Sequence, residues 1–179
     1  QGKWVYAKDI QVGQKLRRDC YEQEFGDTEF VPGRFWTEDL AHLLGFVVGD
    51  GSVTDKAVVL FDTDESLIDD LAAMAVRVGW ENPRKRITSQ NDNVWELKLH
   101  NSARAREVAS QYCNGGRLPE SVFSAPLNIR RAFLRGLFEA DGNPNWKTGH
   151  TKITMANKDL VEDISRLLES CGIKATVRS

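Results

Sequence analysis

Two aspartates, Asp50 and Asp141, each follow an apolar run and precede a glycine. The segments around them read LLGFVVGDG for residues 43–51 and LRGLFEADG for residues 134–142. Two carboxylates brought to one point repel each other, so such a pair usually shares a proton or binds a cation. The neighbouring sequence offers oxygen ligands and no set of Cys and His, so the expected cation is a hard ion such as Mg²⁺.

Two helices must position these carboxylates. Each apolar run predicts a helix that ends at its aspartate, with the following glycine in the left-handed conformation that commonly stops a helix. Small residues four positions apart lie on one helix face and allow two helices to approach closely. The residues with this spacing are Gly45 with Gly49 and Gly136 with Ala140. Packing along these faces would bring Asp50 and Asp141 together. The alternative is that each Asp-Gly is an ordinary C-terminal turn, which two matched copies make less favourable.

The repetition extends beyond the two aspartates. Residues 64–79 and 157–172 are equally long, begin with the N-cap residues Asp64 and Asn157, and close on glycine. Each segment carries an apolar stripe at helical spacing. The stripes are Leu67, Leu71, Met74 and Val78 in the first copy, and Leu160, Ile164, Leu167 and Cys171 in the second. The chain is therefore interpreted as a tandem duplication.

Short alternating runs lie between these helices. In residues 94–99 the apolar Trp95, Leu97 and Leu99 share one face, and the runs 84–88, 150–155 and 173–178 alternate similarly. Period-two alternation with one apolar face predicts half-buried antiparallel strands. Each repeat then reads helix, two strands, helix, two strands, and a further helix over residues 101–112 closes the first. The fold class is α+β, with two antiparallel sheets.

The paired segments resemble the two signature helices of the LAGLIDADG homing endonucleases of the single-chain kind, and the resemblance covers the chain from about Phe35 onward. The stretch KWVYAKDIQVGQKL, residues 3–16, resembles the segment that follows the N-terminal splicing blocks of an intein. The resemblance implies an intein-like segment over residues 1–34, a first repeat over 35–126, and a second repeat over 127–179 that ends early. It also implies pseudo-two-fold αββαββα repeats whose two sheets form a DNA-binding saddle around the central helices.

The family resemblance implies site-specific, Mg²⁺-dependent cleavage of both strands of a long asymmetric DNA site, by a monomer with internal pseudo-symmetry; Ca²⁺ would bind without supporting cleavage. Asp50 and Asp141 would be catalytic metal ligands, with the backbone carbonyls of Gly49 and Ala140 adding ligands. Polar residues on an exposed strand face suit the major groove, and phosphate contacts would position the protein. The expected DNA-binding residues are Arg84, Arg86, Glu96, Lys98, Arg130, Arg131, Lys147, Lys152, Thr154 and Arg178.

One basic residue departs from the family pattern. Intein-type members carry a lysine shortly before a proline ahead of the second motif, and here that position is Gly116, followed by Arg117. A guanidinium supplies charge but stays protonated, so Arg117 replaces the lysine only in part. Lys98 is the other basic candidate for catalysis. The alternative function is therefore a catalytically impaired LAGLIDADG module that binds DNA without cutting it.

Composition sets few limits. The net charge of −2 is unusual for a DNA-binding chain, but residues 80–135 hold ten Lys and Arg against five Asp and Glu. Such segregation fits one face toward phosphate and one toward solvent, but on charge alone the favoured interpretation is a set of solvated faces without a partner. Three scattered cysteines favour a reducing cytoplasm over disulfides or a zinc site. The family resemblance implies a prokaryotic, archaeal or phage host. No apolar run is long enough to cross a membrane. His42 and His150 are expected to be structural or DNA-facing side chains.

Overall fold

The computed structural model describes residues 29–31, 33–88, 93–112 and 116–178. The expected intein-like segment, residues 1–34, lies mostly outside these ranges. A small two-stranded sheet precedes the first repeat, and a short helix precedes the second. These are β1 (Glu29–Val31), β2 (Arg34–Phe35) and α4 (Glu120–Ser124). The first repeat consists of α1 (Glu38–Asp50), β3 (Gly51–Val53), β4 (Ala57–Asp62), α2 (Glu65–Arg77), β5 (Arg84–Ile87), β6 (Trp95–His100) and α3 (Ser102–Tyr112). The second consists of α5 (Leu127–Asp141), β7 (Asn143–Asn145), β8 (His150–Lys152) and α6 (Lys158–Ser170).

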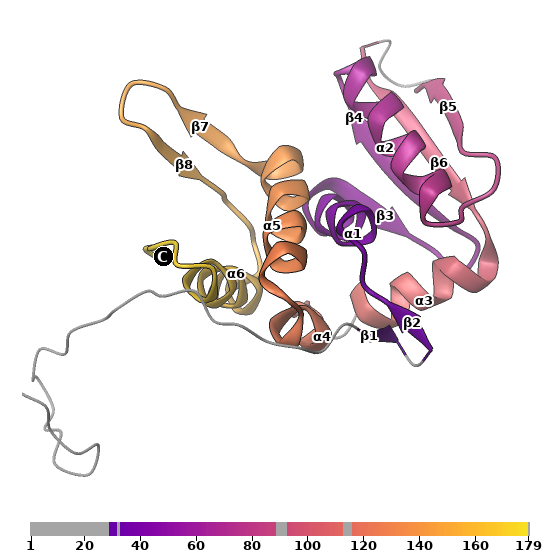
Figure 1. The fold of residues 1–179 in the computed structure, drawn as a ribbon. Helices are drawn as coiled ribbons and strands as arrows, with labels where there is room; N and C mark the ends of the chain where they lie inside the picture. The colour runs from indigo at the N-terminus through magenta and orange to yellow at the C-terminus, as the bar shows by residue number, and fades with distance from the viewer. Residues whose placement is uncertain (1–28, 32, 89–92, 113–115, 179) are drawn as a thin grey trace, which may run out of the picture.

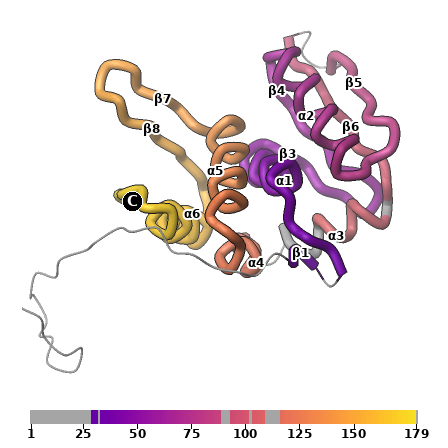
Figure 2. Tube along the Cα trace, in the orientation of Figure 1, coloured from indigo at the N-terminus to yellow at the C-terminus, as the bar shows by residue number. Residues whose placement is uncertain are grey.

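Helices α1 and α5 pack against each other at the centre of the molecule (Figure 1). The four-stranded sheet of the first repeat lies on one side of this pair, and the β7–β8 hairpin lies on the other. The tube view in Figure 2 shows the same arrangement, with both strand regions starting from the C-terminal ends of the two central helices. The predicted α+β fold with paired signature helices is confirmed.

The first sheet has the antiparallel order β3-β4-β6-β5. One face carries Leu60, Leu97 and Leu99, which are buried against the helices. Lys85 belongs to this face, and its Nζ lies 2.5 Å from Asp69 Oδ1 on α2. Because side chains alternate along a strand, the intervening residues point to the opposite face, which no described helix covers. The alternation predicted over residues 94–99 is therefore observed.

The second repeat has the shorter pattern αββα. Its sheet contains only β7 and β8, with Asn143 opposite Lys152 and Asn145 opposite His150. Residues 173–178, expected to form a strand, adopt no helix or strand. Their apolar residues Ile173 and Val177 are exposed because no sheet lies beneath them. The second half therefore repeats the central helix and its hairpin but lacks a second strand pair among its described residues.

The N-cap predictions hold, whereas the glycines after the central helices behave differently from expectation. Asp64 accepts from Ser66 N, and Asn157 accepts from Leu160 N, at the starts of α2 and α6. Gly51 has φ −107° and Gly142 has φ −75°, so neither is left-handed. A Cβ at Gly142 would overlap the carbonyl oxygen of Phe138, and a Cβ at Gly51 would lie 2.6 Å from the Val47 oxygen. Glycine is required at both positions because the chain turns tightly over the last helical turn.

None of the helices within the described ranges is long and apolar enough to span a membrane.

Candidate functional site

The ends of the two central helices bring Asp50 and Asp141 together. Close helix packing produces this arrangement: a Cβ at Gly49 would lie 2.6 Å from the Cβ of Ala140 and 3.5 Å from the Cβ of Asp141. Deeper in the interface, a Cβ at Gly45 would overlap the Phe133 carbonyl, and one at Gly136 would overlap the His42 carbonyl. The small residues identified from spacing thus line the helix contact, which aligns the two aspartates.

Among the described residues, no basic side chain pairs with the carboxylates of Asp50 and Asp141, so their negative charge is uncompensated. Burial raises the pKa of Asp50, and the nearby charges of Asp141 and Asp62 raise it further. Within the described ranges, neither Asp50 nor Asp141 has a hydrogen bond or ion pair to another side chain. The carbonyls of Gly49 and Ala140 belong to the last helical turn, where carbonyl groups lack intrahelical partners. Two carboxylates and two carbonyls of the last helical turns are hard oxygen ligands, and this donor set fits a divalent cation such as Mg²⁺.

Asp62 is an acidic residue that the sequence motif did not identify. It ends β4, a strand adjacent to β3, and its charge contributes to the raised pKa of Asp50. Its Oδ1 accepts from Asp64 N at 2.7 Å. The described residues contain no group of three or more His, Cys, Asp or Glu arranged to hold a metal ion. The candidate site therefore rests on the two helix-terminal aspartates and their backbone oxygens.

Four of the predicted DNA-binding residues share the uncovered face of the first sheet. Arg84 lies opposite Lys98, and Arg86 lies opposite Glu96, on the paired strands β5 and β6. Arg86 and Glu96 neutralise each other through bonds of 2.9 and 3.1 Å. Arg84 and Lys98 make no ion pair within the described residues. The register also places Lys98 level with Val59 and Ser52, and Ser52 is two residues beyond Asp50.

The predicted residues of the second half lie along the hairpin and beyond it. Lys152 is on β8, Lys147 is in the turn that joins β7 to β8, and both are exposed. Thr154 follows β8 and is also exposed, while its neighbours Ile153 and Met155 pack against the core. Arg178 lies in the C-terminal segment without regular structure, so the expected strand position for this residue is wrong.

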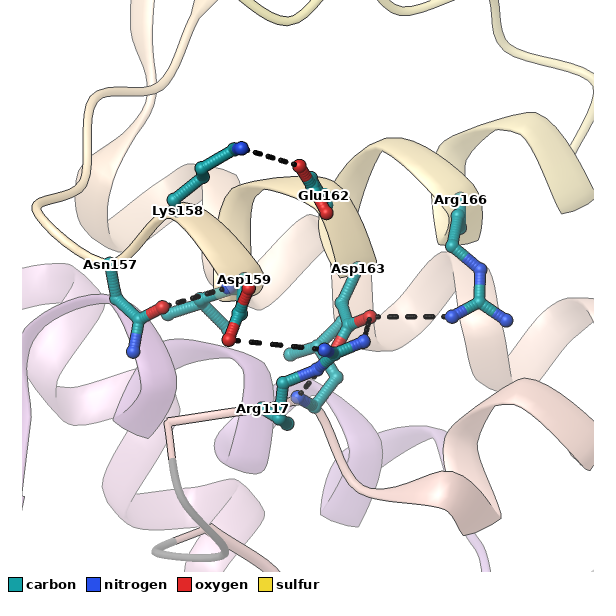
Figure 3. Close-up of polar contacts among 9 residues, drawn as sticks. Arg117, Asn157, Lys158, Asp159, Glu162, Asp163 and Arg166 are labelled. Atoms are coloured by element: carbon teal, nitrogen blue, oxygen red, sulfur yellow. Dashed lines mark hydrogen bonds and ion pairs between the residues drawn. The ribbon is translucent and has the colours of Figure 1, made fainter. Parts of the chain in front are cut away.

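Arg117 is not placed for catalysis. Its Nε and Nη2 donate to the Asp163 carboxylate at 2.8 and 2.6 Å, and Asp163 also accepts from Leu118 N (Figure 3). This bond raises the pKa of the Arg117 guanidinium further. The ion pair between Arg117 and Asp163 links the segment before α4 to α6. This contact lies near the start of α5, whereas Asp141 is at the end of α5 (Figure 1). The catalytic role expected for Arg117 is therefore replaced by a structural one.

The structure also explains why a lysine is absent at position 116. Gly116 has φ +75°, a left-handed conformation that side chains disfavour. A Cβ at this position would overlap the side-chain amide of Asn157, which caps α6. Asp163 itself was missed by sequence reasoning. Asp163 lies three residues after Leu160, on the apolar face of α6, and an acid on such a face indicates a buried carboxylate with a partner.

Arg130 is not a phosphate contact. Its side chain is fully buried, its Nε donates to Ala125 O at 3.0 Å, and its Nη1 donates to Ser170 O at 2.7 Å. It joins the start of α5 to the last residue of α6. Arg131 is exposed but lies ten residues before Asp141, which is roughly 15 Å along a helix. There it lines a surface groove with Glu38 and Asp39. The structure separates both arginines from the strand surface.

His42 is a buried structural side chain at the α1–α5 contact, as one of the two sequence readings expected. It is 2% exposed, and Arg135 Nε donates to its Nδ1 at 3.0 Å. A guanidinium only donates, so Nδ1 is unprotonated and the ring proton is on Nε2. Nε2 lies 2.7 Å from Glu139 Oε2, a close contact whose direction is poor for a hydrogen bond. Burial lowers the pKa of His42, against the opposing charge of Glu139.

The chain matches a family of proteins and several larger relatives. The model of the LAGLIDADG-like domain matches residues 37–112 and 128–179. The NrdEB alpha subunit of the ribonucleoside-diphosphate reductase of Bacillus subtilis is 25% identical over 198 residues, covering 98% of this chain and 17% of the relative. A probable translation initiation factor of Thermococcus kodakarensis is 29% identical over 149 residues, covering 78% of this chain and 12% of that protein. A DNA polymerase of Pyrococcus horikoshii is 29% identical over 136 residues, covering 76% and 10%. The chain thus spans less than a fifth of these proteins.

Solved structures share the fold. I-DmoI in complex with DNA and Mn matches with a TM-score of 0.60 and 24% identity, over 79% of this chain and 81% of that one. I-DmoI in complex with DNA and Ca matches with a TM-score of 0.60 and 23% identity, over 78% and 74%. The N-terminal LAGLIDADG domain of DUF199/WhiA matches with a TM-score of 0.53 and 18% identity, over 79% and 70%.

Proposed function

Since the chain belongs to the LAGLIDADG-like family, we propose that it is a site-specific endonuclease that hydrolyses both strands of a long, asymmetric DNA target with Mg²⁺. The observation that carries this proposal is the pairing of Asp50 with Asp141 at the ends of α1 and α5. A protein that used this fold only to bind DNA would gain nothing from two adjacent carboxylates, which repel each other and the phosphates. I-DmoI, whose fold the chain shares, has been solved with DNA and Mn.

The two sheets supply the DNA surface in this proposal. They extend from the ends of the helices that carry the aspartates, so a duplex lying across both sheets would pass over Asp50 and Asp141 (Figure 1). Arg84, Lys98, Lys147 and Lys152 are basic residues of this surface that make no ion pair within the described residues. Such side chains neutralise phosphates and read base edges in the major groove. One chain contains both halves, so it acts as a monomer.

Asp50, Asp141 and the carbonyls of Gly49 and Ala140 would hold the divalent ion. When bound, such an ion neutralises charge on the phosphate and lowers the pKa of a water nucleophile. Lys98 is the basic residue best placed to assist, because it points to the uncovered face and lies level with Ser52, near Asp50. Its ammonium would stabilise charge on the phosphate, a role that Arg117 cannot fill from its position on Asp163.

We also propose that the domain is an insert within a host protein, in the manner of an intein. Its relatives include a reductase subunit, a translation factor and a polymerase, proteins with unrelated printed functions. Each is matched over a small fraction of its own length. A segment shared by otherwise unrelated proteins is the expected pattern for a mobile element that inserts into host genes.

The test starts from a library of random duplexes, from which the protein selects its preferred site in Ca²⁺ buffer. The selected site, placed in a supercoiled plasmid, is then incubated with Mg²⁺ or with EDTA. Linear product that forms only with Mg²⁺, and that Asp50→Asn and Asp141→Asn abolish while retaining binding, is the expected result. Asp55→Asn, which removes an exposed acid from the β3–β4 turn, serves as the control. Equal cutting by Asp50→Asn would contradict the metal assignment.

A second candidate is a DNA-binding module that no longer cuts. The observation that favours it is Gly116, where the left-handed backbone disfavours a lysine and a Cβ would overlap the side-chain amide of Asn157. The plasmid experiment separates the two functions, because this alternative predicts selection of a site in Ca²⁺ and no linear product in Mg²⁺.

A further inference from the structure

The turn of the β7–β8 hairpin presents an aromatic side chain to solvent. Trp146 is 89% exposed, more than any other large apolar residue in the described ranges. A tryptophan in water leaves a large apolar surface unburied, and exposed tryptophans are common where a partner covers them. By contrast, Trp36 and Trp80 are buried in the core. Trp146 therefore contributes nothing to the packing of the fold.

The turn that carries Trp146 is held by its own hydrogen bonds. Asn145 Oδ1 accepts from Lys147 N at 3.1 Å and from Thr148 N at 3.2 Å. Asn145 O accepts from Gly149 N at 2.9 Å, and Gly149 adopts φ +69°. The indole is thus attached to a fixed turn, so little backbone ordering is needed when it meets a partner.

The charge around Trp146 indicates the partner. Residues 142–158 contain three lysines and one histidine and no Asp or Glu, in a chain whose net charge is −2. Lys147 and Lys152 make no ion pair within the described part of the chain. In the first sheet, Lys85 and Arg86 are instead neutralised by acids. An aromatic ring flanked by positive charges without an ion pair suits duplex DNA, which offers phosphates beside the apolar thymine methyl groups of the major groove.

The distance from the aspartates gives the position of this contact. Trp146 follows Asp141 by five residues, and the chain between them is mostly extended along β7. At about 3.4 Å per residue it spans roughly 17 Å. DNA rises about 3.4 Å per base pair, so Trp146 would meet the duplex about five base pairs from the point between the two aspartates.

The first repeat has no equivalent contact. Its corresponding hairpin, β3–β4, turns through Thr54, Asp55 and Lys56, which are polar and include an acid. We propose that Trp146 is a specificity-determining DNA contact for one flank of the target, where its indole packs against apolar base edges, such as thymine methyl groups, in the major groove of the second half-site. This inference rests on the proposed function. The proposed contact adds a strongly exposed aromatic side chain to one half of the recognition surface.

The experiment compares Trp146→Ala, Trp146→Phe and Phe35→Ala on the duplex selected in Ca²⁺. Phe35 is the matched control, because it is also exposed, at 62%, but lies on β2 away from the strand surface. Trp146→Ala is expected to bind about tenfold more weakly, because losing the recognition of a single base pair weakens specific binding by about this factor. Trp146→Phe retains most of the affinity, and Phe35→Ala binds as the wild type does.

Hydroxyl-radical footprints of the same complexes locate the effect. Trp146→Ala should lose protection on one flank only, about five base pairs from the centre. Unchanged affinity and footprint for Trp146→Ala, with tight binding by the wild type, would overturn the inference while leaving the nuclease proposal intact. If the wild type selects no duplex, the proposed function itself fails. Thermal melts of the variants should match the wild type, because the replaced side chain is exposed.

Discussion

The carbonyl oxygen of Phe133 on α5 occupies the space that a side chain would need at Gly45 on α1. Gly136 meets the His42 carbonyl in the same way from the opposite helix. The backbones of α1 and α5 are therefore in direct contact, and this closeness brings Asp50 and Asp141 to one point. The closeness of the two aspartates therefore depends on the smallest residues in the helix interface.

Adding a methyl group at Gly49 should destabilise the protein, and removing one from its partner should restore it. Gly49→Ala places a Cβ 2.6 Å from Ala140 Cβ. Overpacking of this kind costs about 1–3 kcal/mol in unfolding free energy. The double variant Gly49→Ala with Ala140→Gly should recover most of this loss, since only the milder contact with Leu137 O at 3.2 Å remains. Urea unfolding measures both effects, and a double variant no more stable than Gly49→Ala would contradict this account of the packing.

Removing one carboxylate from the helix ends should stabilise the metal-free protein. Burial and the charges of Asp141 and Asp62 raise the pKa of Asp50, so its ionised form is unfavourable in the folded state. Asp50→Asn should therefore raise the melting temperature in EDTA. Millimolar Mg²⁺ should raise the wild-type melting temperature, because a ligand of the native state stabilises it, and should leave that of Asp50→Asn unchanged.

Asp55→Asn is the control for this measurement, since Asp55 is an exposed acid of the same half. It should keep the wild-type response to Mg²⁺. An equal Mg²⁺ response in Asp50→Asn would place the ion elsewhere.

Breaking the ion pair between Arg117 and Asp163 should affect folding and leave the chemistry unchanged. The Asp163 side chain is 3% exposed, and Arg117→Ala leaves its carboxylate with only Leu118 N and a 3.5 Å contact from Arg166. A fall in the free energy of unfolding is expected, smaller than for a fully buried pair because Arg117 is partly exposed. Lys158→Ala, which removes a surface pair with Glu162, should change stability by less than about 0.5 kcal/mol.

Cleavage per folded molecule tests whether this role is only structural. Well below its melting temperature, Arg117→Ala should cut the selected plasmid at the wild-type rate. A large loss of rate in a fully folded variant would return Arg117 to the catalytic site.

His42 should make the protein less stable in mild acid. Burial lowers its pKa below the ordinary 6.5, so the unfolded chain takes up a proton that the folded chain does not. Stability then rises with pH across this window: the contribution is present above about pH 6.5 and is lost progressively as the pH falls toward the lowered pKa. Urea titrations between neutral and mildly acidic pH should show a smaller decline for His42→Gln than for the wild type.

The matched control is His150→Gln, which removes an exposed imidazole on β8. Its stability should follow the wild-type pH dependence. If His42→Gln also follows that dependence, the buried imidazole is not the group responsible.

Much of the central architecture could be predicted from local sequence. Repeated apolar runs with small residues four apart specify helix faces, and N-caps such as Asp64 and Asn157 specify where helices begin, because both depend on neighbouring residues. The pairing of Asp50 with Asp141 followed from the repeat itself. The alternation of Leu97 and Leu99 with Lys98 likewise identified the two faces of the first sheet.

The tertiary structure decided how the individual charges are used. Arg117 and Arg130 look like free cations in sequence, but their partners, Asp163 and Ser170, are distant along the chain and reach them only after α6 packs on α5. Residues 173–178 alternate like a strand, yet a strand needs a neighbour to pair with, and the sequence of the segment alone does not provide one. The exposure of Trp146 was also a result of folding, because only packing determines which tryptophans the core leaves out.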